Sequence, residues 1–105
     1  MGKIDIGRVF AALGDPTRRA IVDKLSAAPS SVSRLAEPLD ITVTAVAQHL
    51  AVLESCGLVK TQKIGRVRTC RIESAGFDAL QAWIGEHRTM WERRLDALGD
   101  VLDED

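Results

Sequence analysis

Residues 42 to 49 carry side chains that can hydrogen-bond to the edges of nucleic-acid bases. Two hydroxyls, one amide and one imidazole stand among small apolar side chains, and no Lys, Arg, Asp or Glu interrupts them. Amides and hydroxyls bind base edges and phosphate oxygens, and methyl groups contact thymine, so short side chains of these types suit a helix that lies in a DNA groove. The candidate DNA-contacting residues are Thr42, Val43, Thr44, Ala47, Gln48 and His49.

A basic segment follows. Every charged residue between positions 58 and 72 is a Lys or an Arg, which gives this stretch a charge of +5. Such side chains bind DNA phosphates, although Lys and Arg also protect the exposed edge strands of many hairpins. Their place directly after the uncharged segment favours phosphate binding, and the candidates are Lys63, Arg66 and Arg68.

A helix and a hairpin are needed to position these two sets of side chains. Thr42 is a typical N-cap residue, and Gly57 is a typical left-handed residue after a last helical turn. Two alternating β-branched runs, 58 to 64 and 67 to 72, meet around Gly65 and predict the hairpin. Apolar residues at spacings of four and three predict the buried side of the helix: Val46, Leu50 and Leu53.

Helices are also predicted before this segment. An apolar stripe over residues 6 to 13 indicates a first helix, and Asp15 followed by Pro16 indicates the N-cap and first residue of a second. Residues 27 to 31 are expected to form a loop. Ser31 then caps a third, short helix, which we expect Pro38 to end.

A final helix with apolar residues along one side follows the hairpin. The predicted fold is mainly α with a small β-hairpin, a winged helix-turn-helix in the order α-α-α-α-β-β-α. We expect a single domain over residues 1–105, with the helix-turn-helix at 31–57, the wing at 58–73 and dimerisation helices at 5–13 and 75–102.

The composition is that of one soluble domain. The 105 residues are 46% hydrophobic with a net charge of −1, and no apolar run approaches the roughly 18 residues that a membrane span needs. Asp5 and Arg8 interrupt the first apolar stretch, so no signal peptide is predicted, and a cytoplasmic location without membrane contact is expected. Residues 73 to 105 have a net charge of −6, so the positive charge is concentrated in the hairpin.

Three segments resemble the ArsR (ArsR/SmtB) family of winged-helix transcriptional regulators: ALGDPTRRAIVDKL at residues 12 to 25, ITVTAVAQHLAVLESCGLV at 41 to 59, and VKTQKIGRVRTCRI at 59 to 72. The resemblance extends over nearly the whole chain. It implies a homodimer, formed by the first and last helices, that binds a palindromic operator in double-stranded promoter DNA and acts as a repressor. The chain departs from the family at Val43 and Ala47, where Gln and Ser are common, so base recognition would rest on Thr44 and Gln48.

The last helix carries more large apolar side chains than a domain of 11.4 kDa needs for its own core. Aromatic anchors are favoured at protein interfaces, which agrees with a dimer. Alternatively, the two tryptophans cover the back of the helix-turn-helix. The candidate interface residues are Val9, Phe10, Trp83, Trp91, Leu95 and Leu98.

Metal-sensing members of the family hold metals through thiolates in the third helix or through His and carboxylate groups in the last. The matching third-helix positions, 31 to 34, hold Ser, Val, Ser and Arg, and His87 has only Glu86 beside it, about 100° around the helix. We therefore expect a metal-independent member without a cofactor, controlled either by an unknown small-molecule effector or by the protein's own level alone. His49, beside the buried stripe, is expected to be a partly buried packing residue rather than a metal ligand, and His87 an interface or surface residue.

Two further functions stay open. Cys56 and Cys70 could form a redox switch if the fold brings their Cα atoms within about 7 Å and lowers the pKa of one thiol; otherwise they are two small buried side chains. The winged helix could also hold an acidic protein partner. An enzyme is not predicted, because no nucleophile elbow, phosphate loop or metal-ligand spacing occurs.

Overall fold

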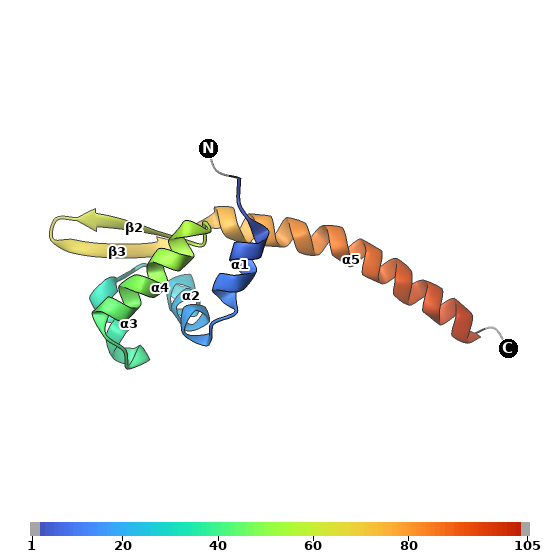
Figure 1. Cartoon of the computed structure of the whole chain (residues 1–105), viewed down its shortest axis with the longest axis horizontal. Coiled ribbons are helices and arrows are strands. Elements are labelled where there is room, and N and C mark those ends of the chain that lie inside the picture. The colour runs from blue at the N-terminus through green and yellow to red at the C-terminus, as the bar shows by residue number, and fades with distance from the viewer. Residues whose placement is uncertain (1–2, 104–105) are drawn as a thin grey trace.

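A hairpin and a long helix extend in opposite directions from a small helical body (Figure 1). The computed structural model describes residues 3 to 103 and measures 69 × 34 × 20 Å. No helix among these residues combines the length and the apolar character that crossing a membrane requires. The elements are α1 (Ile6–Leu13), α2 (Pro16–Ala27), β1 (Ser30–Ser31), α3 (Val32–Leu39), α4 (Val43–Ser55), β2 (Val59–Ile64), β3 (Val67–Ile72) and α5 (Ser74–Asp103).

Side-chain caps fix where the helices of the body begin. The Asp15 carboxylate accepts the backbone N–H of Arg18 at 2.9 Å, and the Thr42 hydroxyl accepts that of Ala45 at 3.0 Å. Ser31 caps α3 in the same way, so the three predicted caps are confirmed. The hydrogen bond from Arg18 lowers the pKa of Asp15 below its usual value.

The end of α3 differs from the prediction. Pro38 does not stop the helix, which continues to Leu39 because the fixed φ of proline is itself helical. Asp40 ends it instead. This residue adopts the left-handed conformation, with φ of 53°, and its N–H donates to the carbonyl of Glu37 at 3.1 Å.

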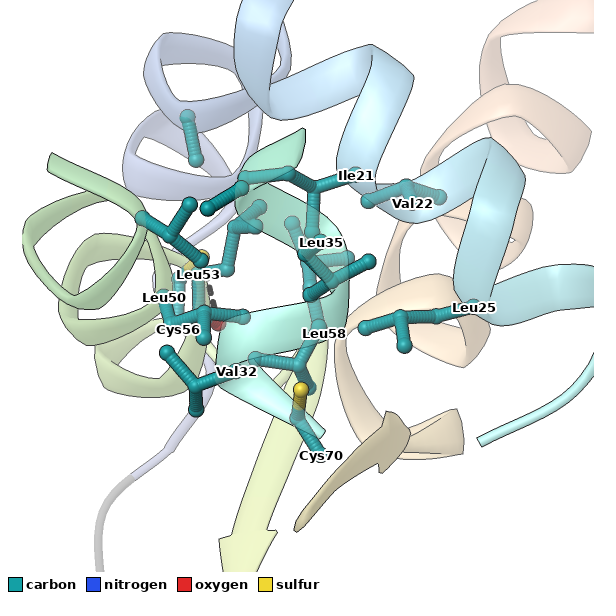
Figure 2. Close-up of a cluster of buried hydrophobic side chains, with 14 of the residues drawn as sticks. Ile21, Val22, Leu25, Val32, Leu35, Leu50, Leu53, Cys56, Leu58 and Cys70 are labelled. Carbon is teal, nitrogen blue, oxygen red and sulfur yellow. Dashed lines mark hydrogen bonds between the residues drawn. The ribbon is translucent and has the colours of Figure 1, made fainter. Parts of the chain in front are cut away.

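The core lies where α1 to α4 meet the base of the hairpin. Figure 2 shows side chains of α2, α3, α4 and β3 converging on one cluster. The predicted stripe of α4 is buried: Val46, Leu50 and Leu53 expose 2% or less. Val9 was expected at a dimer interface, and the structure corrects this. Its side chain is fully buried within the same core, so it offers no surface to a partner.

The hairpin belongs to a three-stranded antiparallel sheet in the order β1-β3-β2. Strand β1 lies in the segment predicted to be a loop, and its Ser30 and Ser31 pair with Cys70 and Thr69 of β3. A strand of two residues has no periodicity to detect. It forms because the chain entering α3 runs along the free edge of β3.

Two glycines bring the end of α4 against the start of α5. Gly57 has φ of 79°, as predicted for the residue after the helix, and its carbonyl accepts the N–H of Gly76 at 2.7 Å. A Cβ atom on Gly76 would lie 2.8 Å from the carbonyl oxygen of Cys56, closer than van der Waals contact allows. Glycine is therefore required at this crossing.

Candidate nucleic-acid interface

The outer face of α4 carries five of the six side chains predicted to contact DNA. The buried stripe anchors the opposite side of the helix, so this face is turned to solvent. Among the described residues, the Thr44 hydroxyl and the Gln48 amide have no hydrogen-bond partner, which leaves both groups free for a ligand. The exposed residues are Thr42, Val43, Thr44, Ala47 and Gln48.

His49 is not part of this face. It is half-buried, and its Nδ1 lies 3.4 Å from Nη1 of Arg18. Arg18 also donates from Nε to the carbonyl of Ala12 at 2.7 Å. The His49 ring thus lies next to Arg18 of α2 and is less exposed than the other five candidate side chains.

One face of the hairpin packs against the core at its inner end, and the other face does not. Directly paired residues of antiparallel strands project from the same face. The pairs Val59–Ile72, Thr61–Cys70 and Lys63–Arg68 therefore share a face, and its inner end is buried against the core at Val59 and Cys70. Lys63 and Arg68 extend this face beyond the core, and Arg68 lines a small cavity together with Ala47 and Ala51 of α4.

The remaining basic residues of the hairpin lie elsewhere. Lys60 pairs with Arg71 on the opposite face. Arg66 occupies the turn next to Gly65, whose φ of 63° the tight connection requires. Of the three candidates for phosphate binding, Arg66 is therefore at the tip of the hairpin, and Lys63 and Arg68 are on the face whose inner end packs against the core.

Electrostatics around the hairpin favour an anion. Lys63 and Arg68 stand directly opposite each other, an arrangement that is unfavourable without a counter-charge. Within residues 3 to 103 the only ion pair is Arg88–Glu92, at 2.9 Å on α5. None of the hairpin cations has a carboxylate partner in this part of the chain.

A groove connects the hairpin to the helices. It is open and has a volume of about 260 Å³. In the sequence, Ser33 is only a position that matches a metal ligand of related sensors, yet its side chain lines this groove together with Val43. Only the fold reveals this neighbourhood, because the approach of the hairpin to α3 leaves no pattern in the sequence. The lining residues are Ser31, Val32, Ser33, Val43, Arg66, Val67 and Arg68.

Helix α5 presents a second, apolar surface. Phe10 of α1 packs against Trp83, with ring centroids 4.9 Å apart, and Trp83 stacks on His87 at 4.1 Å. The Nδ1 of His87 donates to the carbonyl of Trp83 at 2.8 Å. Trp83 is half-buried against Phe10 of α1, and neither tryptophan belongs to the side chains that pack against the core of the helix-turn-helix. The exposed apolar residues of this surface include Phe10, Ile84, Trp91, Leu95, Leu98, Val101 and Leu102.

The positions of metal ligands in related sensors hold capping groups here. The Ser31 hydroxyl accepts the N–H of Arg34 and lies 3.3 Å from the hydroxyl of Ser33. Across residues 3 to 103, no three His, Cys, Asp or Glu side chains are grouped closely enough to hold a metal ion.

The two cysteines are free and buried. The Cys70 thiol donates to the carbonyl of Ser30 at 3.1 Å, and the Cys56 thiol donates to the carbonyl of Leu53 at 3.4 Å. Burial raises the pKa of both thiols. The redox hypothesis required a lowered pKa, and in this respect it is wrong.

Comparisons with known proteins agree with this geometry. A family profile described as a helix-turn-helix domain matches residues 13–62. The HTH-type transcriptional regulator Rv2034 of Mycobacterium tuberculosis is 35% identical, over 91% of this chain and 87% of that protein. The crystal structure of an ArsR family transcriptional regulator, RHA00566, is 45% identical with a TM-score of 0.76, covering 83% of this chain and 90% of the other. The homodimeric winged helix-turn-helix domain Mb0332 of Mycobacterium bovis is 26% identical with a TM-score of 0.64, covering 88% and 82%.

Proposed function

Because this chain belongs to the ArsR family of winged helix-turn-helix transcriptional regulators, we propose that it binds a palindromic promoter operator as a homodimer and represses transcription without a metal. The family consists of DNA-binding regulators and not enzymes, as the sequence predicted. The observation that carries the proposal is that exposed side chains of α4 and basic side chains of the hairpin line the same openings: Val43 lines one with Arg66 and Arg68, and Ala47 lines another with Arg68.

In this proposal α4 is the recognition helix and lies in the major groove. Its exposed side chains are short, so the backbone can approach the base edges closely. Thr44 and Gln48 have free hydrogen-bonding groups and would contact bases, while the methyl groups of Val43 and Ala47 would contact thymine. The Thr42 hydroxyl is occupied by the helix cap, so its contribution is to helix geometry.

The hairpin is the wing and would bind the backbone beside that groove. Lys63 and Arg68 share one face of the wing, Arg68 lines a cavity with residues of α4, and Arg66 is at the tip. Phosphates supply the counter-charge that these residues lack within the described chain.

A dimer would double these contacts. The exposed apolar side chains of α5 and Phe10 form a surface whose burial against a second copy is favourable. Two recognition helices about 34 Å apart match successive major grooves on one side of the duplex. The homodimeric state of Mb0332 supports this arrangement.

Repression would follow from occupation of a promoter by the dimer. Metal independence is supported by the side chains at positions 31 to 34, where hydroxyls cap a helix and a cation stands where carboxylates or thiolates would bind.

Selection of duplexes from a random-sequence pool by the purified chain tests the proposal. We expect one enriched two-fold symmetric motif. Gln48→Ala should then relax preference at one base pair, at a cost of about 1–3 kcal/mol. Arg66→Ala should weaken binding to all sequences and reduce the slope of log affinity against log salt by about one.

Arg71→Ala is the matched control, because it removes the same charge from the opposite face of the wing. It should leave the slope close to the wild-type value. Recovery of all duplexes equally, or of none, would contradict sequence-specific binding and favour a protein-interaction module.

A further inference from the structure

One side chain outside the core ties the recognition helix to the wing. Glu54 lies in the last turn of α4 and is exposed. Its Oε1 accepts the backbone N–H of Thr61 at 3.0 Å and the Thr61 hydroxyl at 3.1 Å, and its Oε2 lies 3.1 Å from the same hydroxyl. Both carboxylate oxygens are therefore bound to a single residue of β2.

Thr61 is at the outer edge of the sheet. Strand β2 is the last in the order β1-β3-β2, so its outward N–H groups have no neighbouring strand. On the other side of the wing, β1 pairs with Thr69 and Cys70 of β3. Thr61 is paired with Cys70 across the hairpin, and Cys70 is paired with Ser30 of β1. Glu54 therefore binds the β2 edge directly opposite the point where β1 binds the β3 edge.

The support acts where the wing leaves the core. Val59 and Cys70 are buried, whereas Lys63 and all residues of the tip are exposed. Glu54, Thr61 and Arg68 line one small cavity of about 40 Å³ between the wing and α4. A change at this contact would be amplified at the tip, since the strands continue outward from it as a two-stranded ribbon.

We propose that Glu54 is a positioning residue for DNA binding, which holds the wing at the angle at which Arg66 and Arg68 reach phosphates while α4 lies in the major groove. The inference rests on the proposed function. A carboxylate on the DNA-facing side of a protein repels phosphates, so its charge alone would weaken binding. The hydrogen bonds from Thr61 to Glu54 instead strengthen DNA binding, because a wing that is already held in position loses less conformational entropy when it binds DNA.

Two substitutions separate these effects. Glu54→Gln and Glu54→Ala remove the same negative charge, but only glutamine keeps a side-chain oxygen that can accept from Thr61. With a duplex selected by the wild-type protein, Glu54→Gln should bind as tightly as the wild type or more tightly. Glu54→Ala should bind about 10-fold more weakly than Glu54→Gln, and its salt slope should fall by about one to two because the wing contacts are lost.

The wing residues provide the second half of the test. When Lys63, Arg66 and Arg68 are all replaced by alanine, Glu54→Ala should change affinity by less than about twofold, since none of the proposed wing contacts is left to position. Thr61→Val removes the hydroxyl but keeps the backbone N–H, and it should fall between the wild type and Glu54→Ala. Far-UV circular dichroism and thermal unfolding of each variant report folding independently of DNA.

Equal affinities and equal salt slopes for Glu54→Ala and Glu54→Gln would overturn the positioning role. The positioning role would also be overturned if the loss of affinity caused by Glu54→Ala persisted in full in a protein that lacks Lys63, Arg66 and Arg68. A different result would overturn the proposed function itself: no duplex selected by the wild type, or a salt slope that the loss of these three residues leaves unchanged.

Discussion

The fold lowers the reactivity of the two cysteine thiols. Burial raises the pKa of Cys56 and Cys70, so the reactive thiolate is scarce at neutral pH. We expect an aromatic disulfide reagent at pH 7.5 to modify both thiols at least about 100-fold more slowly in the native protein than after unfolding.

Ser55→Cys provides the control for thiol reactivity. Ser55 is exposed and adjacent to Cys56, so a thiol there should react rapidly in the folded protein. Fast modification of the wild type, with a rate near that of Ser55→Cys, would contradict the buried state of the cysteines.

Local rules predicted individual residues well where one hydrogen bond decides the outcome. The caps at Asp15, Ser31 and Thr42 need only a side-chain oxygen next to free N–H groups. The orientation of Val9 and Phe10 was beyond such rules. These neighbours on α1 differ by about 100°, and only the position of α5 decides that Val9 enters the core and Phe10 contacts Trp83.

At the scale of elements, the N-cap of α2 makes stability dependent on pH. The pKa of Asp15 is lowered, first through the hydrogen bond from the N–H of Arg18. A carboxyl with a lower pKa in the folded state stabilises the fold above its unfolded pKa and loses this contribution as the pH falls through the folded pKa. The free energy of unfolding should therefore decrease below about pH 4, and less steeply in Asp15→Asn.

Urea denaturation at a series of pH values measures this dependence. Asp23→Asn removes an exposed carboxylate from the same helix and should keep the wild-type decrease at low pH. If Asp15→Asn and the wild type lose stability in parallel, the cap is not the source of the pH dependence.

The helices and strands in which apolar residues recur at a regular spacing were predicted from the sequence. Features that exist only through contact with another part of the chain were not. The spacing of Val46, Leu50 and Leu53 predicted the buried face of α4. Strand β1 was missed because it exists only through its pairing with β3. The contact between Glu54 and Thr61 was missed for a related reason: neither residue has a distinctive pattern, and the turn after α4 brings them together.

For the whole molecule, the central expectation is that α5 holds two copies together. Leu95 exposes 66% of its surface, and Leu95→Glu would place a charge in an apolar interface, which is strongly unfavourable. We expect the variant to sediment as a monomer. Its affinity for a symmetric duplex should fall by about 100-fold or more, since the second recognition helix is no longer tethered.

Thr89→Glu introduces the same charge on the other side of α5, where Thr89 is also exposed. It should remain dimeric and bind DNA as the wild type does. Dimerisation of Leu95→Glu at wild-type strength would place the interface elsewhere.

The overall architecture was predictable from the chain because three separate segments resemble one family. Matches at residues 12 to 25, 41 to 59 and 59 to 72 predicted the order of helices and hairpin. The projection of the hairpin and α5 from opposite ends of the body was not predicted (Figure 1). It depends on the angle between α4 and α5, which no periodicity encodes.

That angle is set by the backbone contact between Gly57 and Gly76, where a side chain would collide with residues 56 and 57. Helix α5 is 30 residues long, and all but its first two residues lie at or beyond Gly76. At about 1.5 Å per residue it is about 45 Å long, so a rotation of about 5° at the crossing would displace its far end by about 4 Å. In a dimer joined along α5, this pair of glycines would therefore determine the half-site spacing that the protein accepts, although neither is among the residues proposed to contact DNA.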